Sequence, residues 1–167
     1  MVFQNLLDVH QRSAVPKATE PEPKVFYLKM KADYYRYMAE VATDEDRSGV
    51  VELAKGAYQE AMDIATSKIA AINPTRLGLA LNFSVFLKSV DEARKVAQKA
   101  IDLAQADIAT LTVPLADDAS TNLRTMRENM ELWTPEGGNI CICVCCSCYK
   151  CHKRTFLLVL IANSVLS

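Results

Sequence analysis

The chain has few of the residues that build disulfide-bonded or all-β proteins. Its first 140 residues contain no cysteine, because all six cysteines fall at 141, 143, 145, 146, 148 and 151. The main part of the chain therefore has no disulfide framework, and we expect a cytoplasmic protein. Five glycines and six prolines in 167 residues leave too few turn formers for an all-β fold.

The chain also has no large excess of positive or negative charge. Nineteen Lys and Arg face twenty Asp and Glu, a net charge of -1, which does not favour nucleic acid as a partner. The first fifteen residues do not form a secretory signal, because Asp8, His10 and Arg12 interrupt their apolar run. The apolar run at 156–166 is too short to span a bilayer, which needs about 20 residues, so we do not expect membrane association.

Hydrophobic residues recur at helical spacing through the main part of the chain and predict an all-α fold. Short connections between amphipathic helices favour antiparallel neighbours, so we expect an antiparallel helical array. A tetratricopeptide-like repeat is the alternative, but no self-similar period supports it. The expected elements are a helical remnant at 4–15, a loop at 16–23, and helices at 25–42, about 49–71, about 75–88, from a cap at Asp91 through Ile108, and around Leu123 to Trp133.

The helix expected at 25–42 has a predicted buried stripe and two cations that suggest an anion site. Lys29 and Arg36 are two turns apart, roughly 10 Å of rise, and Tyr37 follows directly. Two cations with a neighbouring hydroxyl suit a phosphate oxyanion. The alternative is that Lys29–Asp33 and Arg36–Glu40 are surface ion pairs, worth about 0.2–0.5 kcal/mol each. The stripe consists of Phe26, Met30, Tyr34, Tyr37 and Val41.

Four longer motifs point to a known family. They are VFYLKMKADYYRYMAEVA at 25–42, AYQEAMDIA at 57–65, NPTRLGLALNFSVF at 73–86 and RENMELW at 127–133. In this order they closely resemble the 14-3-3 family, from about Gln4 to Trp133. We therefore expect a partial 14-3-3 domain at 1–133, with about five helices after the remnant, followed by a separate tail at 134–167.

The resemblance implies binding of phosphorylated serine or threonine in extended peptides. The chain would then be an adaptor in signal transduction, with phosphorylated client proteins as partners and no cofactor. By the same resemblance, Lys29, Arg36 and Tyr37 would bind the phosphate. The residues lining the peptide groove would be Leu81, Asn82, Val85, Asn129 and Trp133.

Departures from the family pattern predict a weakened site. The resemblance begins late in the family's fourth helix, so we expect its first three helices, with two further phosphate-binding cations, to be missing. Each lost charge-assisted bond costs about 1.5–3 kcal/mol. Groove positions that are usually apolar are Thr121, Asn122 and Thr125 here. The family's dimer rests on the missing helices, so we do not expect it to form.

The tail at 134–167 differs sharply in composition from the rest of the chain. Its six cysteines and His152 could supply zinc ligands, but they crowd together without the separated pairs of usual zinc sites. Acylation of the clustered cysteines is a second possibility. We favour a third, an appended segment from alternative splicing or read-through, and expect no metal site.

Two other classes of function are compatible with a helical chain to different degrees. The alternative is a helical scaffold that binds unphosphorylated partners through exposed apolar faces. An enzyme is not expected, because the sequence shows no nucleophile–base pairing and no glycine-rich phosphate loop.

Overall fold

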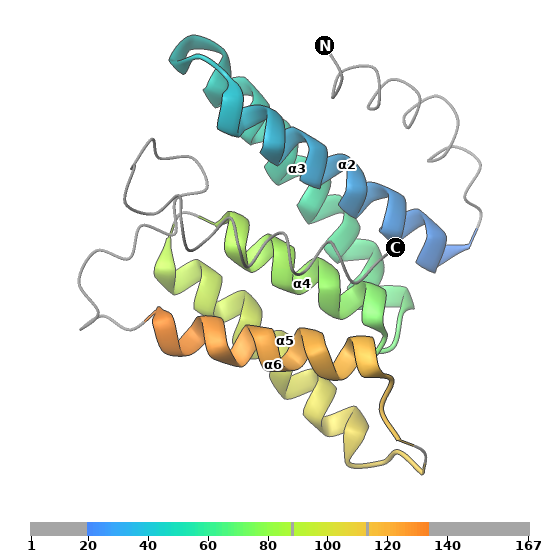
Figure 1. Cartoon of the computed structure of the whole chain (residues 1–167). Coiled ribbons are helices and arrows are strands. Elements are labelled where there is room, and N and C mark those ends of the chain that lie inside the picture. Colours follow the sequence, from blue (N-terminus) through green and yellow to red (C-terminus); the bar gives the residue numbers. More distant parts are fainter. Residues whose placement is uncertain (1–19, 88, 113, 134–167) are drawn as a thin grey trace.

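The computed structural model describes residues 20–87, 89–112 and 114–133, and its described part contains only helices and connections. Figure 1 shows their order along the chain. The expected all-α fold is confirmed. The remnant expected at 4–15 and the cysteine-rich tail lie outside the described residues. The helices are α2 (Pro21–Val41), α3 (Asp44–Lys68), α4 (Pro74–Phe86), α5 (Val90–Ile108) and α6 (Asp117–Leu132).

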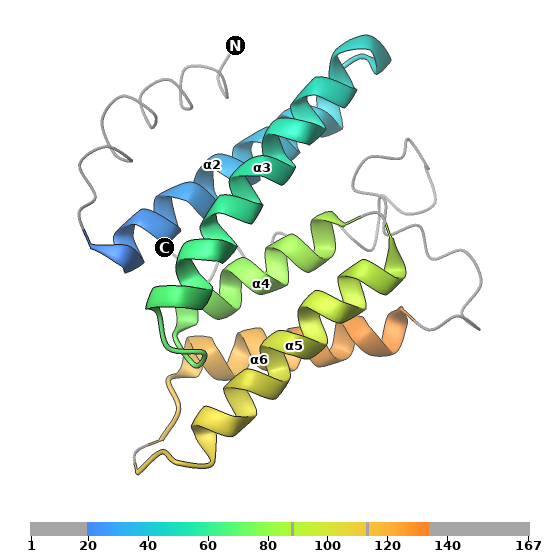
Figure 2. The same cartoon turned by 180° about the vertical axis from the view of Figure 1, so that it is seen from behind.

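The helices form an array in which α4 occupies the centre. The chain reverses between α2 and α3, and these two helices pack along each other. Helix α4 contacts α2 and α3 on one side and α5 and α6 on the other, as Figures 1 and 2 show from opposite directions. Because α4 touches all four other helices, its side chains can join groups from both halves of the array.

Local capping chemistry explains where several helices begin. Asn73 caps α4: its side-chain oxygen accepts from the amides of Thr75 and Arg76, at 2.9 and 3.2 Å, and Pro74 follows at the first helical position. The expected cap at Asp91 was wrong. Ser89 caps α5 instead, accepting from the amide of Glu92, and Asp91 lies in the first turn.

The expected bounds of two helices also need correction. Helix α2 begins at Pro21, inside the predicted loop, because proline is well suited to a first helical turn. Helix α3 spans Asp44–Lys68 rather than 49–71.

The buried stripe of α2 differs from the predicted one. Phe26 is 38% exposed and Val41 75%, whereas alanines not counted in the prediction are fully buried. Small side chains let α2 approach α3 and α4 closely, so the contact face is shifted by one or two residues along the helix. Leu53 of α3 is 54% exposed. The buried apolar residues of α2 are Val25, Leu28, Ala32, Tyr35 and Ala39.

Aromatic rings link α3 to α4 in the core. The Tyr58 ring, fully buried, lies 5.4 Å from the Phe83 ring and 5.2 Å from the Phe86 ring, centroid to centroid. Such pairs contribute about 0.5–1.5 kcal/mol beyond their buried area. The phenol of Tyr58 is therefore held at a defined position where α2, α3 and α4 meet.

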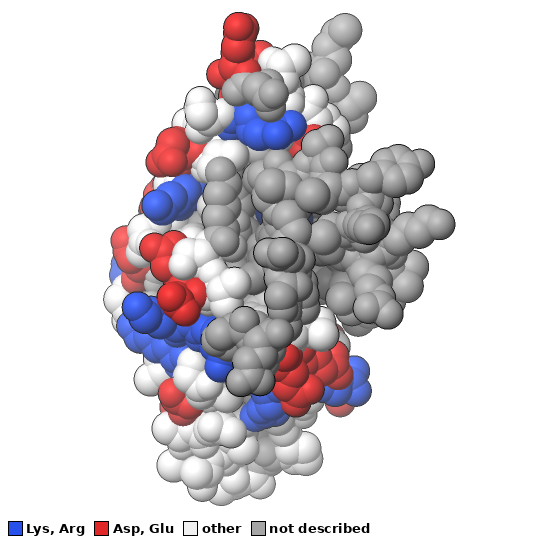
Figure 3. Space-filling view, turned by 90° about the vertical axis from the view of Figure 1, so that its left-hand side faces the viewer, with Lys and Arg blue, Asp and Glu red and all other residues white. Residues whose placement is uncertain are grey.

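The described surface carries both charge signs. On the face in Figure 3, Lys and Arg side chains lie between Asp and Glu side chains, and neither sign forms an extended area. Within the described ranges, the structure contains no helix with the length and apolar character needed to cross a bilayer.

Candidate functional site

The carboxylate of Asp33 is the centre of a polar cluster between α2, α3 and α4. Lys29 Nζ lies 3.2 Å from Oδ2, and Arg36 Nη2 lies 3.5 Å from Oδ1. The amide Nδ2 of Asn82 donates to both oxygens at 3.1 Å, and the Tyr58 hydroxyl donates to Oδ1. One carboxylate thus positions both cations and the amide that the sequence had singled out.

Arg36 lies at the inner end of this cluster and is only 3% exposed. Its Nε donates to the Tyr58 hydroxyl at 3.3 Å, and its Nη1 lies 3.5 Å from Glu40 Oε1. The guanidinium carbon also lies 4.4 Å from the centre of the Tyr37 ring, a cation–π contact. Tyr37 thus lies beside the guanidinium, and its ring contacts the guanidinium carbon.

One nitrogen of Arg36 has an ion-pair partner but no hydrogen bond. The buried Nη1 makes no hydrogen bond within the described part of the chain, although Glu40 is near it. A buried donor without an acceptor costs about 1–3 kcal/mol. An anion that displaced Glu40 could accept a hydrogen bond from this nitrogen.

The charges around Arg36 keep it protonated and keep Tyr58 neutral. Burial lowers the pKa of Arg36, but its electrostatic interactions with the Tyr58 phenol group and the Asp33 carboxylate outweigh burial and raise this pKa above its ordinary value. Burial and the Asp33 carboxylate raise the pKa of Tyr58 well above its ordinary value. Tyr58 is therefore a hydrogen-bond donor to Asp33 at neutral pH.

Helix α6 approaches the same region at Gly78 of α4. A Cβ atom at this glycine would lie 3.5 Å from Nδ2 of Asn122 and 3.8 Å from Cε of Lys29. Asn122 donates to the carbonyl of Pro74 at 3.3 Å. The stem of Lys29 thus lies where α2, α4 and α6 converge. It lies next to Asn122, one of the groove positions that the sequence predicts to be more polar than in the family.

The remaining predicted groove residues are less closely connected to the cluster. Leu81 and Trp133 are buried at 5% and 6% exposure, and Val85 is partly buried against the core. Asn129 is half-buried, and its carbonyl accepts from the Trp133 amide. Among the described residues, no hydrogen bond or ion pair joins Asn129 or Trp133 to the Asp33 cluster.

Sequence reasoning missed Asp33, Tyr58 and Glu40 as members of the site. The signal was present in part, since Lys29–Asp33 and Arg36–Glu40 were recognised as helical ion pairs, and both pairs exist in the structure. Tyr58 comes from another helix, so no local spacing could identify it. The described part of the chain holds no group of three or more His, Cys, Asp or Glu placed to bind a metal ion.

Comparisons with known proteins agree with the fold and the motifs. The profile of the 14-3-3 protein family matches residues 2–134. The chain is 46% identical over 141 residues to 14-3-3-like protein 2 of Caenorhabditis elegans, covering 82% of this chain and 57% of that protein. It is 50% identical over 135 residues to 14-3-3 protein zeta of Bombyx mori, covering 78% and 53% respectively.

A vertebrate relative gives the same result. The chain is 45% identical over 139 residues to 14-3-3 protein beta/alpha-B of Xenopus laevis, covering 81% of this chain and 57% of that protein. The chain thus spans a little over half the length of these curated relatives. Because the family profile matches most of the chain, and the described helices form the expected array, this protein belongs to the 14-3-3 family.

Proposed function

We propose that this chain binds phosphoserine or phosphothreonine in extended peptides and acts as an adaptor. The supporting observation is the Asp33 cluster, which holds Lys29, Arg36 and the Asn82 amide together. The phosphate would be bound by Lys29 Nζ and by Nη1 of Arg36, where it would replace Glu40. Tyr37 supports Arg36 through its ring.

Asn82 would orient the peptide backbone beside the phosphate. Its Nδ2 is engaged by Asp33, so within the described residues its carbonyl oxygen is the group left to accept a peptide N–H. Leu81, Val85, Asn129 and Trp133 remain our proposed groove residues farther along α4 and α6.

We propose that phosphate binding by this chain alone is weak. The cluster brings together two cations and two carboxylates, so a phosphate must compete with Asp33 for Lys29 and with Glu40 for Arg36. Two charge-assisted bonds of about 1.5–3 kcal/mol each correspond to a Kd between roughly 40 µM and 6 mM.

The test is a titration of the chain against a fluorescent phosphoserine peptide and its unphosphorylated twin, followed by anisotropy. Lys29→Gln should weaken binding of the phosphopeptide about tenfold or more, since it removes one charge-assisted bond. Lys31→Gln is the matched control: it makes the same change on the same helix, outside the cluster. Arg36→Lys keeps the charge but removes the forked donors, and should also weaken binding.

Two outcomes would contradict the proposal. Equal affinities for the two peptides would favour the helical scaffold that binds unphosphorylated partners. Equal losses from Lys29→Gln and Lys31→Gln would show that only overall charge matters.

A further inference from the structure

A pocket of about 420 Å³ lies between α3, α4 and α5, and no residue of the Asp33 cluster lines it. Its volume is in the lower part of the range of about 300–1,000 Å³ that is usual for small-molecule sites. Helix α4 contributes residues to the Asp33 cluster from one face and to this pocket from another. Gly78 and Asn82 meet α2 and α6 groups, whereas Arg76, Ala80 and Phe83 line the pocket.

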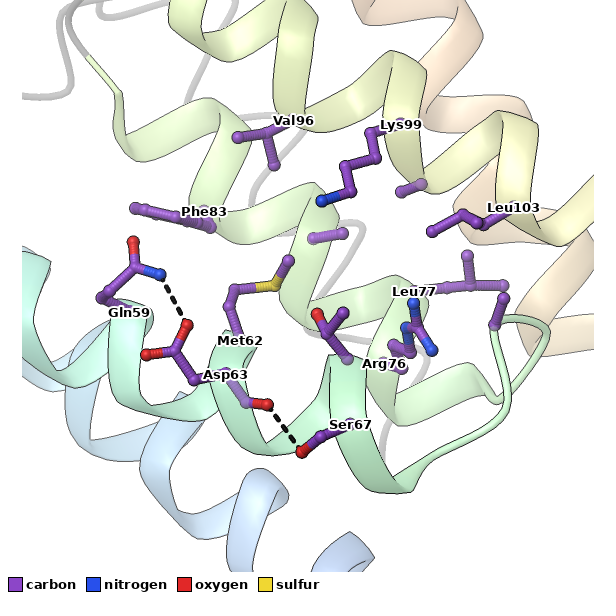
Figure 4. Close-up of a pocket in the computed structure, with 14 residues that line it drawn as sticks. Gln59, Met62, Asp63, Ser67, Arg76, Leu77, Phe83, Val96, Lys99 and Leu103 are labelled. Atoms are coloured by element: carbon purple, nitrogen blue, oxygen red, sulfur yellow. Dashed lines mark hydrogen bonds between the residues drawn. The ribbon is translucent and has the colours of Figure 1, made fainter.

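The middle of the pocket is apolar. Met62 from α3, Ala80 and Phe83 from α4, and Val96 and Leu103 from α5 line it, as Figure 4 shows for those that it labels. Leu103 is 38% exposed, so part of this apolar lining is open to solvent. A ligand with an apolar body would gain about 25 cal/mol for each Å² of apolar surface it covered.

Two cations accompany this apolar lining. Lys99 extends from α5 over the pocket, and Arg76 lies on α4 at its edge (Figure 4). In the described ranges neither cation forms an ion pair, although Nη1 of Arg76 donates to the carbonyl of Ile69 at 2.6 Å. Burial lowers the pKa of Arg76 below its ordinary value, and the Asp107 carboxylate offsets this only in part, so an added anion would favour the charged guanidinium.

The acidic group of the pocket lies on the opposite wall. Asp63 is on α3, and its Oδ1 accepts from Nε2 of Gln59 at 2.9 Å, the bond drawn in Figure 4. The two cations that line the pocket thus lie on α4 and α5 and its acidic lining residue lies on α3, while the Asp107 carboxylate of α5 acts on Arg76 from outside the lining. A carboxylate would be drawn to Lys99 and Arg76, and its apolar body would lie over Met62 and Phe83.

We propose that this pocket binds a small monocarboxylate with an apolar body, such as a medium-chain fatty acid. The unpaired cations favour an anion over a neutral lipid. The apolar lining favours a single carboxylate over a polyphosphate, which would have to lose its hydration against hydrocarbon.

Decanoate is the probe and decanol is its neutral counterpart. The full-length chain, labelled with ¹³C at methionine methyl groups, is titrated with each compound and followed by NMR. The Met62 methyl lines the pocket and should shift on addition of decanoate, whereas the Met126 methyl, buried in α6, is the internal control. Decanol should bind more weakly.

Two kinds of variant test separately whether binding depends on the charge and on the shape of the pocket. Lys99→Gln should raise the Kd for decanoate about two- to fivefold, the effect of a partly exposed ion pair. Lys95→Gln, an equal charge change on the same helix outside the pocket, should leave the Kd unchanged. Ala100→Phe fills the pocket and should abolish the Met62 shift while the helical circular dichroism is retained.

The proposal fails if the Met62 methyl does not move, or if decanoate binds the Ala100→Phe variant as tightly as the original chain. Equal affinity for decanoate and decanol would show that the two cations do not contribute to binding. If only an acidic amphipathic peptide moves Met62, the site is a protein docking surface and the small-molecule assignment is wrong. None of these outcomes depends on phosphopeptide binding.

Discussion

Replacing Tyr58 with phenylalanine should destabilise the chain by about 2 kcal/mol. The change removes one hydroxyl, which donates to Asp33 and accepts from Nε of Arg36 at 3.3 Å. The ring stays, with its contacts to Phe83 and Phe86 at 5.4 and 5.2 Å, so the loss of apolar packing is small. Hydrogen bonds to charged groups contribute about 1.5–3 kcal/mol, and here the fully buried site admits no replacement by solvent.

Urea denaturation followed by far-UV circular dichroism measures this loss. The midpoint should fall while the slope stays the same, because the surface exposed on unfolding does not change. For a chain of this size, about 2 kcal/mol corresponds to a melting temperature lower by roughly 4–8 °C. A Tyr58→Phe chain within about 0.5 kcal/mol of the original would refute the idea that this hydroxyl organises Asp33 and Arg36.

Three further predictions test the same structure. Because the pKa of Tyr58 is raised on folding, the native chain keeps a proton that the unfolded chain releases above about pH 10. Stability should therefore fall as pH rises past that value, by up to about 1.4 kcal/mol per pH unit more than in Tyr58→Phe, and paired urea series would detect it. Asn73→Ala removes the cap of α4 and should cost about 1 kcal/mol in the same assay, whereas no change would exclude a role for the cap. Met126→Ala, at a fully buried position, should cost about 2–5 kcal/mol, and Leu53→Ser, at a position 54% exposed, less than about 0.5; similar losses would contradict the observed burial.

The fold was predictable because its signals are local. Helical spacing predicted helices in the right order, and the helix predicted at about 75–88 corresponds to α4. The buried face of α2 was not predictable in the same way, because aromatic residues occupy both sides of it. Ala32 and Ala39 decide which side is buried, and that choice depends on close packing against neighbouring helices.

The spacing of residues along the chain could indicate site residues only within one helix. Lys29 and Arg36 stood out by spacing and by resemblance. Tyr58, 25 residues from Asp33, did not stand out, and Asn82, 49 residues from Asp33, was predicted through the family resemblance alone. The motif in α2 supplies the cations, while tertiary packing places the phenol and the amide on the carboxylate between them.

The most direct test of phosphate recognition is the side-chain NMR signal of Arg36 Nε–H in the full-length chain. Adding a phosphoserine peptide should shift this signal, because a phosphate at Nη1 changes the charge next to the Nε–Tyr58 hydrogen bond, and the unphosphorylated twin should leave it in place. Arg36→Lys assigns the signal by removing it. An Arg36 signal that stays unmoved at saturating phosphopeptide, or that moves equally with both peptides, would contradict the account.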